Sequence, residues 1–264
     1  MLRMRVTRFQ LLLAATAVLA VAVFCLSAGT ARWIMLSLLF TASGLAAGLG
    51  VSFPEWGLFG FSLCRVRTMQ KVVSLTFDDG PDPASTPALL DLLARRGVRA
   101  TFFCVGRHVA SHRDLVRRIA AEGHLIGNHS FAHSRGTNLF GDARLRADIE
   151  LAQQEITRTV GRTPEFFRPP MMLTNPRIFR VTRALSLTVA GCAIRCYDLR
   201  GGSAQEMLAR VQRRLRPGVI IAMHDGGVPA ERLVNLAGQL LDKLDTQGYR
   251  CLRLDELVAC EEPA

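Results

Sequence analysis

The chain has 264 residues and a formal net charge of +11, from 33 basic and 22 acidic residues. The basic excess is spread along the chain with no stripe of interleaved aromatic and basic residues, so the charge does not indicate a nucleic-acid partner. The seven cysteines are an odd number, at spacings that indicate neither a disulfide framework nor a zinc knuckle, and a reducing compartment fits them slightly better.

The first 70 residues predict a membrane anchor. Two stretches, Phe9 to Leu26 and Trp33 to Phe53, carry no charge and are mostly apolar. Each is long enough to cross a bilayer as a helix. We therefore expect two transmembrane helices, at about residues 9–28 and 33–53, joined by a short loop.

The basic residues around these stretches indicate their orientation. Most of them flank the two predicted helices. Arg3, Arg5 and Arg8 precede the first helix, and Arg65, Arg67 and Lys71 follow the second, whereas only Arg32 lies between the two. The tendency of Lys and Arg to stay inside then places both ends of the pair, and the remaining chain, in the cytoplasm of a two-span membrane protein. Alternatively the first stretch is a signal peptide or signal anchor, because small residues follow it at positions 28–31. If the first stretch is an uncleaved anchor and the second only lies against the membrane, the remaining chain would lie outside.

Residues 71–264 are enough for one domain with a full core. Strand and helix patterns alternate in them, which is typical of a βα barrel. We expect strands at 72–77, 100–105, 125–128, 165–168, 188–195, 219–224 and 249–252. We expect helices at 86–96, 113–122, 145–160, 204–215 and 231–246.

A pair of carboxylates, Asp78 and Asp79, closes the first of these strands. Gly80-Pro81 turns the chain at once, so both carboxylates should lie at the carboxyl end of a strand. Enzymes of the α/β class keep their chemistry there.

Two histidines, His129 and His133, are spaced four residues apart. At this spacing they would share a face of a helix or helical turn, and both imidazoles could reach one ion. With one carboxylate they would bind a divalent ion and leave positions open for water and substrate, which suits hydrolysis of an amide or ester. Alone, the Asp-Asp pair before Gly-Pro is commonly just a turn, and the histidine pair is commonly a solvated helix face. Their co-occurrence favours a functional site.

Other polar residues receive structural or surface assignments. His108, His112 and His124 match no ligand pattern. The basic run from Arg210 to Arg216 has the spacing of a solvated helix face, with binding to anionic lipid as the alternative.

Five segments, in this order, resemble the signature of polysaccharide deacetylases, the NodB-homology domain of carbohydrate esterase family 4. They are Thr76 to Pro81, Ala100 to Phe103, Gly127 to His133, Phe167 to Pro170 and Met223 to Asp225. The resemblance covers Lys71 to about Cys260. It implies a distorted (β/α) barrel at residues 71–264, preceded here by the two predicted transmembrane helices.

The resemblance also implies roles for the motif residues. Asp79, His129 and His133 would hold a divalent metal ion, with zinc expected first and cobalt, manganese or nickel as alternatives. Asp78 would be the base that deprotonates the attacking water, and His224 the acid that protonates the leaving amine.

Three further residues would support this reaction centre. Arg168 would keep the Asp78 carboxylate ionised, because an adjacent cation favours the charged form. Asp198 would orient His224 and raise its pKa, and the backbone N–H of Met171 would contribute to an oxyanion hole.

Departures from the family pattern lie around the substrate rather than in the reaction centre. Met171-Met172 stands where an aromatic residue and a glycine are usual, Ala222 replaces a usual leucine, and no tryptophan follows Asp198. Sugar rings are usually gripped by aromatic faces, so a long chitin-like or peptidoglycan chain is not the obvious substrate.

The leading hypothesis is a membrane-anchored, metal-dependent hydrolase that removes N-acetyl groups from an amino-sugar saccharide. Its partners would be that saccharide and, through the N-terminal helices, membrane lipid. The runner-up is a deacylase of another N- or O-acylated substrate, such as a lipid-linked saccharide. A non-catalytic sugar-binding or scaffold protein is a third hypothesis, which the presence of Asp78 and His224 disfavours.

Overall fold

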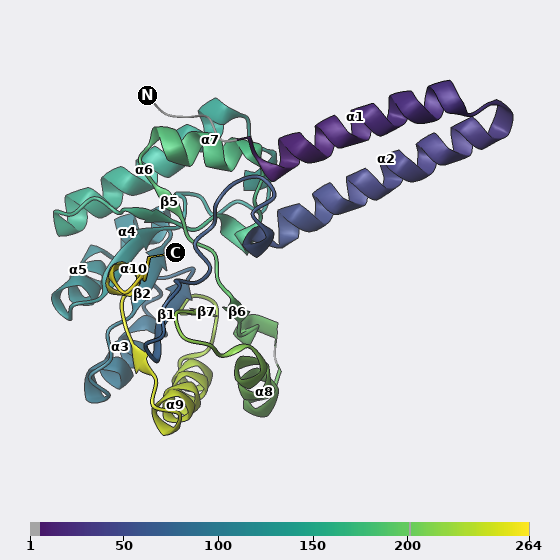
Figure 1. Ribbon diagram of the computed structural model, residues 1–264. Helices are drawn as coiled ribbons and strands as arrows, with labels where there is room; N and C mark the ends of the chain where they lie inside the picture. The colour runs from purple at the N-terminus through teal and green to yellow at the C-terminus, as the bar shows by residue number, and fades with distance from the viewer. Residues whose placement is uncertain (1–5, 201, 264) are drawn as a thin grey trace.

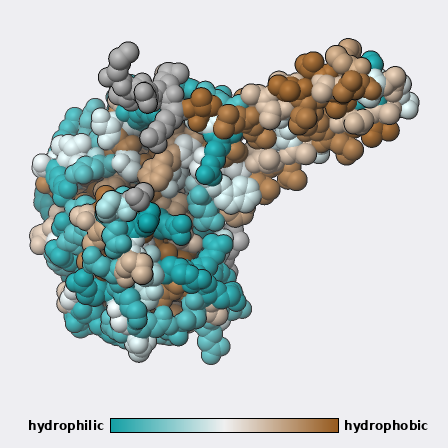
Figure 2. All heavy atoms as spheres, viewed as in Figure 1, coloured by the Kyte–Doolittle hydropathy of each residue, from teal (hydrophilic) through white to brown (hydrophobic). Residues whose placement is uncertain are grey.

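The computed structural model of the chain describes residues 6–200 and 202–263. A long helical hairpin projects from one edge of an α/β domain (Figure 1). The hairpin surface is largely apolar, whereas the visible face of the domain is mostly hydrophilic (Figure 2).

The hairpin consists of α1 (Arg8–Leu26) and α2 (Gly29–Ser52), which pack against each other. Thr7 caps the start of α1 by accepting a hydrogen bond from the backbone N–H of Gln10. The Thr16 and Ser43 hydroxyls, 2.8 Å apart, join the two helices midway. Both helices are long and apolar enough to cross a membrane, and their place at the N-terminus is also compatible with a signal sequence.

The domain contains a curled sheet of eight parallel strands within the described residues. In chain order these are β1 (Val72–Asp78), β2 (Thr101–Cys104), β3 (Leu125–Asn128), β4 (Phe166–Phe167), β5 (Thr188–Val189), β6 (Ile194–Arg195), β7 (Ile220–His224) and β8 (Arg250–Cys251). Their order in the sheet is β5-β4-β3-β2-β1-β7-β6, and β8 pairs with the start of β1. This half-barrel confirms the expected distorted α/β barrel and gathers the carboxyl ends of the strands at one mouth.

Helices cover the sheet between successive strands. They are α3 (Thr86–Arg95), α4 (Gly106–Ser111), α5 (Arg113–Ala121), α6 (Asp142–Val160), α7 (Pro176–Ala184), α8 (Ala204–Arg214), α9 (Ala230–Thr246) and α10 (Leu254–Ala259). Short 3-10 turns are η1 (Pro54–Trp56), η2 (Thr137–Leu139), η3 (Pro170–Met172) and η4 (Asp198–Arg200). The five helices expected from the sequence are present, and the structure adds α7 and the short helices α4 and α10, whose six residues each carry little periodic signal.

One strand prediction was wrong. The segment 188–195 forms two short strands, β5 and β6, instead of one. Between them the carbonyl oxygens of Ala190 and Gly191 accept hydrogen bonds from the buried guanidinium of Arg168. The two strands also pair with different neighbours, β5 with β4 and β6 with β7, at opposite ends of the strand order.

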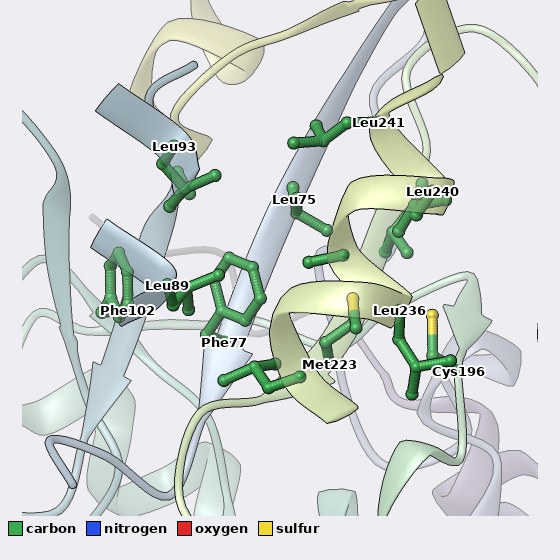
Figure 3. Packing of buried hydrophobic residues seen from close by; sticks show 14 of the residues in the cluster. Leu75, Phe77, Leu89, Leu93, Phe102, Cys196, Met223, Leu236, Leu240 and Leu241 are labelled. Atoms are coloured by element: carbon green, nitrogen blue, oxygen red, sulfur yellow. The ribbon is translucent and has the colours of Figure 1, made fainter. Parts of the chain in front are cut away.

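The core that fixes β1 lies between the sheet and helices α3 and α9. Figure 3 shows Leu75 and Phe77 of β1 among leucines of these two helices. Phe77 stacks on Phe102 of β2, with ring centroids 5.3 Å apart. Every residue of β1 is buried, so the position of its carboxyl end is set by packing on both faces.

A segment that follows the hairpin joins it to the sheet. The backbone N–H of Leu63 donates to Val189 at the end of β5, and the N–H of Ile220 in β7 donates to Cys64. Leu63 and Val66 are buried in the domain core. The hairpin is therefore tied to the domain by backbone pairing, while the boundary at residue 70 stays a prediction.

Candidate active site

The carboxylate pair lies at the mouth of the half-barrel. Asp78 is the last residue of β1 and is in register with Phe103 of β2 and His224 of β7. Asp79 follows with φ 73°, which turns its side chain away from the strand. Gly80 is needed next, because a Cβ there would lie 2.0 Å from the buried carboxylate of Asp225.

Asp79, His129 and His133 converge, as the sequence predicts. The Asp79 Oδ1 atom lies 3.3 Å from His129 Nε2 and 3.0 Å from His133 Nε2. One donor atom from each residue lies within 4.8 Å of the others. Burial opposes the charge of Asp79, but hydrogen bonds from the two imidazoles lower the pKa of this carboxyl far below its usual range.

The two histidines converge from a loop, and the expected helical turn is absent. Residues 129–133 are not helical, and Ser130 and His133 have φ values of 61° and 46°. Helix α6 holds the loop, since the N–H groups of Phe131 and Ala132 donate to the backbone carbonyl and the carboxylate of Asp148, respectively. The loop is thus shaped by tertiary contacts that the four-residue spacing does not reveal.

The orientation of His129 suits a metal ligand. Its Nδ1 atom lies 2.7 Å from the carbonyl oxygen of Arg168. A carbonyl can only accept, so Nδ1 carries a proton, and Nε2, which faces Asp79, is the nitrogen that would bind an ion. Two imidazoles and one carboxylate are a donor set that divalent ions such as zinc accept, and the residues present therefore fit such an ion.

Asp78 is held by a buried arginine. Arg168 Nη1 donates to Asp78 Oδ1 at 2.7 Å and to Thr76 Oγ1 at 2.8 Å. The remaining donors reach the carbonyl oxygens of Ala190 and Gly191, and Arg168 is fully buried over the ring of Phe103. A guanidinium with this many partners keeps a fixed charge beside the carboxylate.

His224 is held by Asp198. The Nδ1 atom of His224 lies 2.9 Å from Asp198 Oδ1, and the backbone N–H of His224 donates to Oδ2 at 2.7 Å. Burial would lower the pKa of this imidazole, but the hydrogen bond to Asp198 and the nearby Asp78 raise it to about 9. The ring therefore carries a proton at neutral pH, with Nε2–H as the remaining donor.

These groups share one cavity of about 180 Å³. It is lined by Asp78, Asp79, His129, His133, Met171 and His224 of the predicted site, while Arg168 and Asp198 stand behind it. Met171 has φ 59° and is 57% exposed, so it forms part of the rim. Ala222 also lines the cavity, as the sequence comparison with the family implied.

Sequence reasoning missed several contributors. Arg195, Tyr197 and Leu199 line the cavity, although no motif marks them. His108, expected in a structural or surface role, has its Nδ1 atom 2.9 Å from the carbonyl oxygen of Asp79 and so supports the turn at that residue. His124 is structural, because it accepts a hydrogen bond from the N–H of Ala100 and burial lowers its pKa to about 4.

Comparisons with known proteins agree with this geometry. A family model described as polysaccharide deacetylase matches residues 65–190. A peptidoglycan-N-acetylglucosamine deacetylase of Bacillus cereus is 31% identical over 201 residues, which cover 75% of this chain and 93% of the relative. A chitooligosaccharide deacetylase of Rhizobium leguminosarum bv. trifolii is 34% identical, over 65% of this chain and 81% of the relative.

A solved structure shows a similar arrangement. The family 4 acetyl xylan esterase from Clostridium thermocellum, in complex with a cobalt ion, superposes with a TM-score of 0.66 and 34% identity. The match covers 72% of this chain and 91% of the esterase. These relatives differ in the saccharide that their names give.

Proposed function

We propose that this chain, which belongs to the polysaccharide deacetylase family, removes N-acetyl groups from an amino-sugar saccharide while anchored to a membrane. The peptidoglycan-N-acetylglucosamine and chitooligosaccharide deacetylases that it resembles are hydrolases of carbon–nitrogen bonds, and this chain is such an enzyme. The observation that carries the proposal is one cavity that combines the Asp79, His129 and His133 cluster with Asp78 and His224.

The cluster would hold a divalent metal ion, with zinc expected first and cobalt, manganese or nickel as alternatives. When bound, the ion supplies Lewis acidity toward the acetyl carbonyl and the attacking water. The hydrogen bond from His129 to the Arg168 carbonyl keeps the ligating nitrogen aimed at Asp79 before any ion arrives.

Asp78 is the proposed general base. Its carboxylate is in the cavity wall, and its Oδ1 atom accepts a hydrogen bond from the buried Arg168 at 2.7 Å. It takes a proton from the attacking water as the new carbon–oxygen bond forms. The same ion pair fixes the direction of the carboxylate, because Arg168 is itself held by Thr76 and two carbonyl oxygens.

His224 is the proposed general acid. Its raised pKa keeps it protonated, and its register partner across the sheet is Asp78. As the carbon–nitrogen bond breaks, the imidazolium gives its proton to the leaving nitrogen, so acetate and a free amine are released. Asp198 holds the ring through Nδ1 and stabilises the charged form.

The rim of the cavity supports the proposed oxyanion role of Met171. This residue follows Pro169-Pro170 in a left-handed turn and lies beside the catalytic groups. Its backbone N–H would stabilise the negative charge that develops on the acetyl oxygen. Apart from Tyr197, the described lining has two methionines and Ala222 where sugar-binding aromatic rings would stack, which favours a short saccharide over a long chitin-like chain.

A specific contact favours a lipid-linked saccharide as the second candidate substrate. Arg195 lines the cavity and donates to the carbonyl oxygen of Ser52 at the end of α2, at 3.1 Å. The N–H of Thr174, two residues after the Met171-Met172 rim, donates to Val51. The end of the apolar hairpin therefore supports one wall of the active site, where an N- or O-acylated head group on a lipid carrier would arrive.

The orientation of the domain is part of the proposal. Arg8 at the start of α1 and Arg65 after the hairpin lie around one cavity at the domain, whereas Arg32 lies near the far turn of the hairpin. The distribution favours a cytoplasmic domain. A single span with an external domain is the alternative.

The proposal can be tested by acetate release from full-length protein in detergent. The panel would contain N-acetylglucosamine oligomers, peptidoglycan fragments, acetylated xylan and a lipid-linked N-acetylglucosamine, with Asp78→Asn as the control. We expect release from at least one N-acetylated substrate and none with the variant. Faster release from acetylated xylan than from every N-acetylated substrate would replace the amide assignment by an ester one.

A further inference from the structure

We propose that a second cavity, at the foot of the hairpin, binds the phosphate group of an anionic membrane lipid. This inference rests on the membrane anchoring proposed above and is independent of the catalytic assignment. The cavity has a volume of about 840 Å³. Its walls come from the start of α1, the segment 54–65, helices α7 and α8, and the residues just before β7.

The walls of this cavity are strongly basic. Six arginines line it: Arg8, Arg65, Arg183, Arg213, Arg214 and Arg216. Among the described lining residues only Glu55 is acidic. A concave surface with this imbalance attracts phosphate, and basic pockets beside transmembrane helices bind anionic lipid head groups.

The arginines fall into two groups. Arg8, Arg214 and Arg216 donate to backbone carbonyl oxygens, namely those of Trp56, Ala193 and Leu215. The side chains of Arg65, Arg183 and Arg213 make no hydrogen bond or ion pair within residues 6–200 and 202–263 and are exposed. Three guanidinium groups are thus available to a ligand without breaking an internal contact.

The place of the cavity identifies the source of the phosphate. The backbone N–H of Phe9 at the start of α1 donates to Leu58, and Phe9 packs edge-on against Phe59, so the foot of the hairpin is fixed to the cavity wall. Trp56 and Phe61 line the cavity and are 45% and 73% exposed. Exposed aromatic residues at the end of an apolar helix are typical of the head-group layer of a bilayer.

The cavity is distinct from the active site. No lining residue is shared between the two cavities among the described residues. Val219, just before β7, lines the basic cavity, whereas His224, at the carboxyl end of the same strand, lines the catalytic one. A lipid bound here would fix the domain against the membrane and would not occupy the substrate position.

The experiment measures lipid retention by the full-length protein. Protein in detergent is mixed with equal amounts of phosphatidylglycerol and phosphatidylcholine and examined by native mass spectrometry. The adducts of each lipid are counted over a series of lipid concentrations. The variant changes Arg65, Arg183 and Arg213 to Gln, and a charge-matched control changes the exposed Arg95, Arg177 and Arg250, which do not line the cavity, to Gln.

We expect the wild type and the control to retain phosphatidylglycerol in preference to phosphatidylcholine. The triple variant should bind phosphatidylglycerol roughly a hundredfold more weakly, since each basic residue near a membrane surface contributes about fivefold to the affinity. Replacement of the same three arginines by Lys should retain most of the binding. If the triple Gln variant does not accumulate, each single Gln variant should lose roughly fivefold.

Equal retention of phosphatidylglycerol by the wild type and the Gln variants would overturn the proposal, as would no preference over phosphatidylcholine. Glycerol phosphate that bound as tightly as the lipid would move the assignment to a soluble phosphate. Acetate release should be unchanged in every variant, so failure here and failure of the proposed activity can be told apart.

Discussion

Replacement of Arg168 by Met should destabilise the domain and abolish turnover together. Arg168 is fully buried and gives four hydrogen bonds, one of them to Asp78 at 2.7 Å. Methionine fills part of the space but leaves the Asp78 carboxylate, which is 2% exposed, without its cation. It also leaves two buried carbonyl oxygens without donors.

The magnitude follows from the burial of the pair. Removing one partner of a buried ion pair costs about 3 to 5 kcal/mol, because the other charge stays uncompensated. Removing Asp78 as well, as Asn, should restore part of this loss, with a coupling of about 0.5 to 3 kcal/mol between the two sites. The exposed pair of Arg146 and Glu150, at 3.0 Å, is a matched control, and Arg146→Met should change stability little.

The assay is pulse proteolysis of the full-length protein across a urea series, with chelator present so that metal binding does not add to stability. Both tryptophans lie in the N-terminal part, at 33 and 56, so their fluorescence would not report the domain. If the double variant lost as much stability as Arg168→Met and Asp78→Asn together, the buried pair would not be coupled. If Arg168→Met kept wild-type turnover, Arg168 would not be needed to position Asp78 as the general base.

Four further outcomes test the site and the topology. His129→Ala should lose both bound metal and activity, whereas Asp78→Asn should keep the metal and lose turnover; metal analysis beside the rate decides, and normal turnover of Asp78→Asn would refute the base assignment. His224→Ala should slow amine release by about 10² to 10⁴ with metal content unchanged. With His224 as the proposed acid, activity should fall as the pH rises toward 9, because the hydrogen bond to Asp198 raises the pKa of His224 to about 9. Asp198→Asn should shift this loss of activity to lower pH, and an unshifted pH profile would contradict the role of Asp198. A phosphatase reporter fused after Ala264 should be silent and a fluorescent protein should fold there, and the reverse result would place the domain outside.

Much of the site could be predicted because its residues follow strands. Asp78, Asp79 and His224 end buried parallel strands, and this places them at one mouth once the fold class is known. The conformation of the histidine loop could not be predicted, because Asp148 on a distant helix shapes it. The break between β5 and β6 could not be predicted either, because the chain there contacts Arg168, which donates to the carbonyl oxygen of Ala190.

The basic cavity is a feature that could not be predicted from the sequence. Arg65, Arg183 and Arg213 are far apart in the sequence, and only the fold brings them to the foot of the hairpin. In the sequence, the run from Arg210 to Arg216 has the pattern of a solvated helix face. Its neighbours across the cavity, which come from three other segments, decide what it can bind.

The central claim is a metal-dependent removal of acetyl groups from an amino sugar. The most direct measurement follows acetate and free amine released from N-acetylglucosamine oligomers by full-length protein before chelation, after chelation and after addition of zinc. We expect equal amounts of acetate and amine, loss of both on chelation, and recovery with zinc. Release that continued undiminished in the chelated protein, or acetate without amine, would contradict the account.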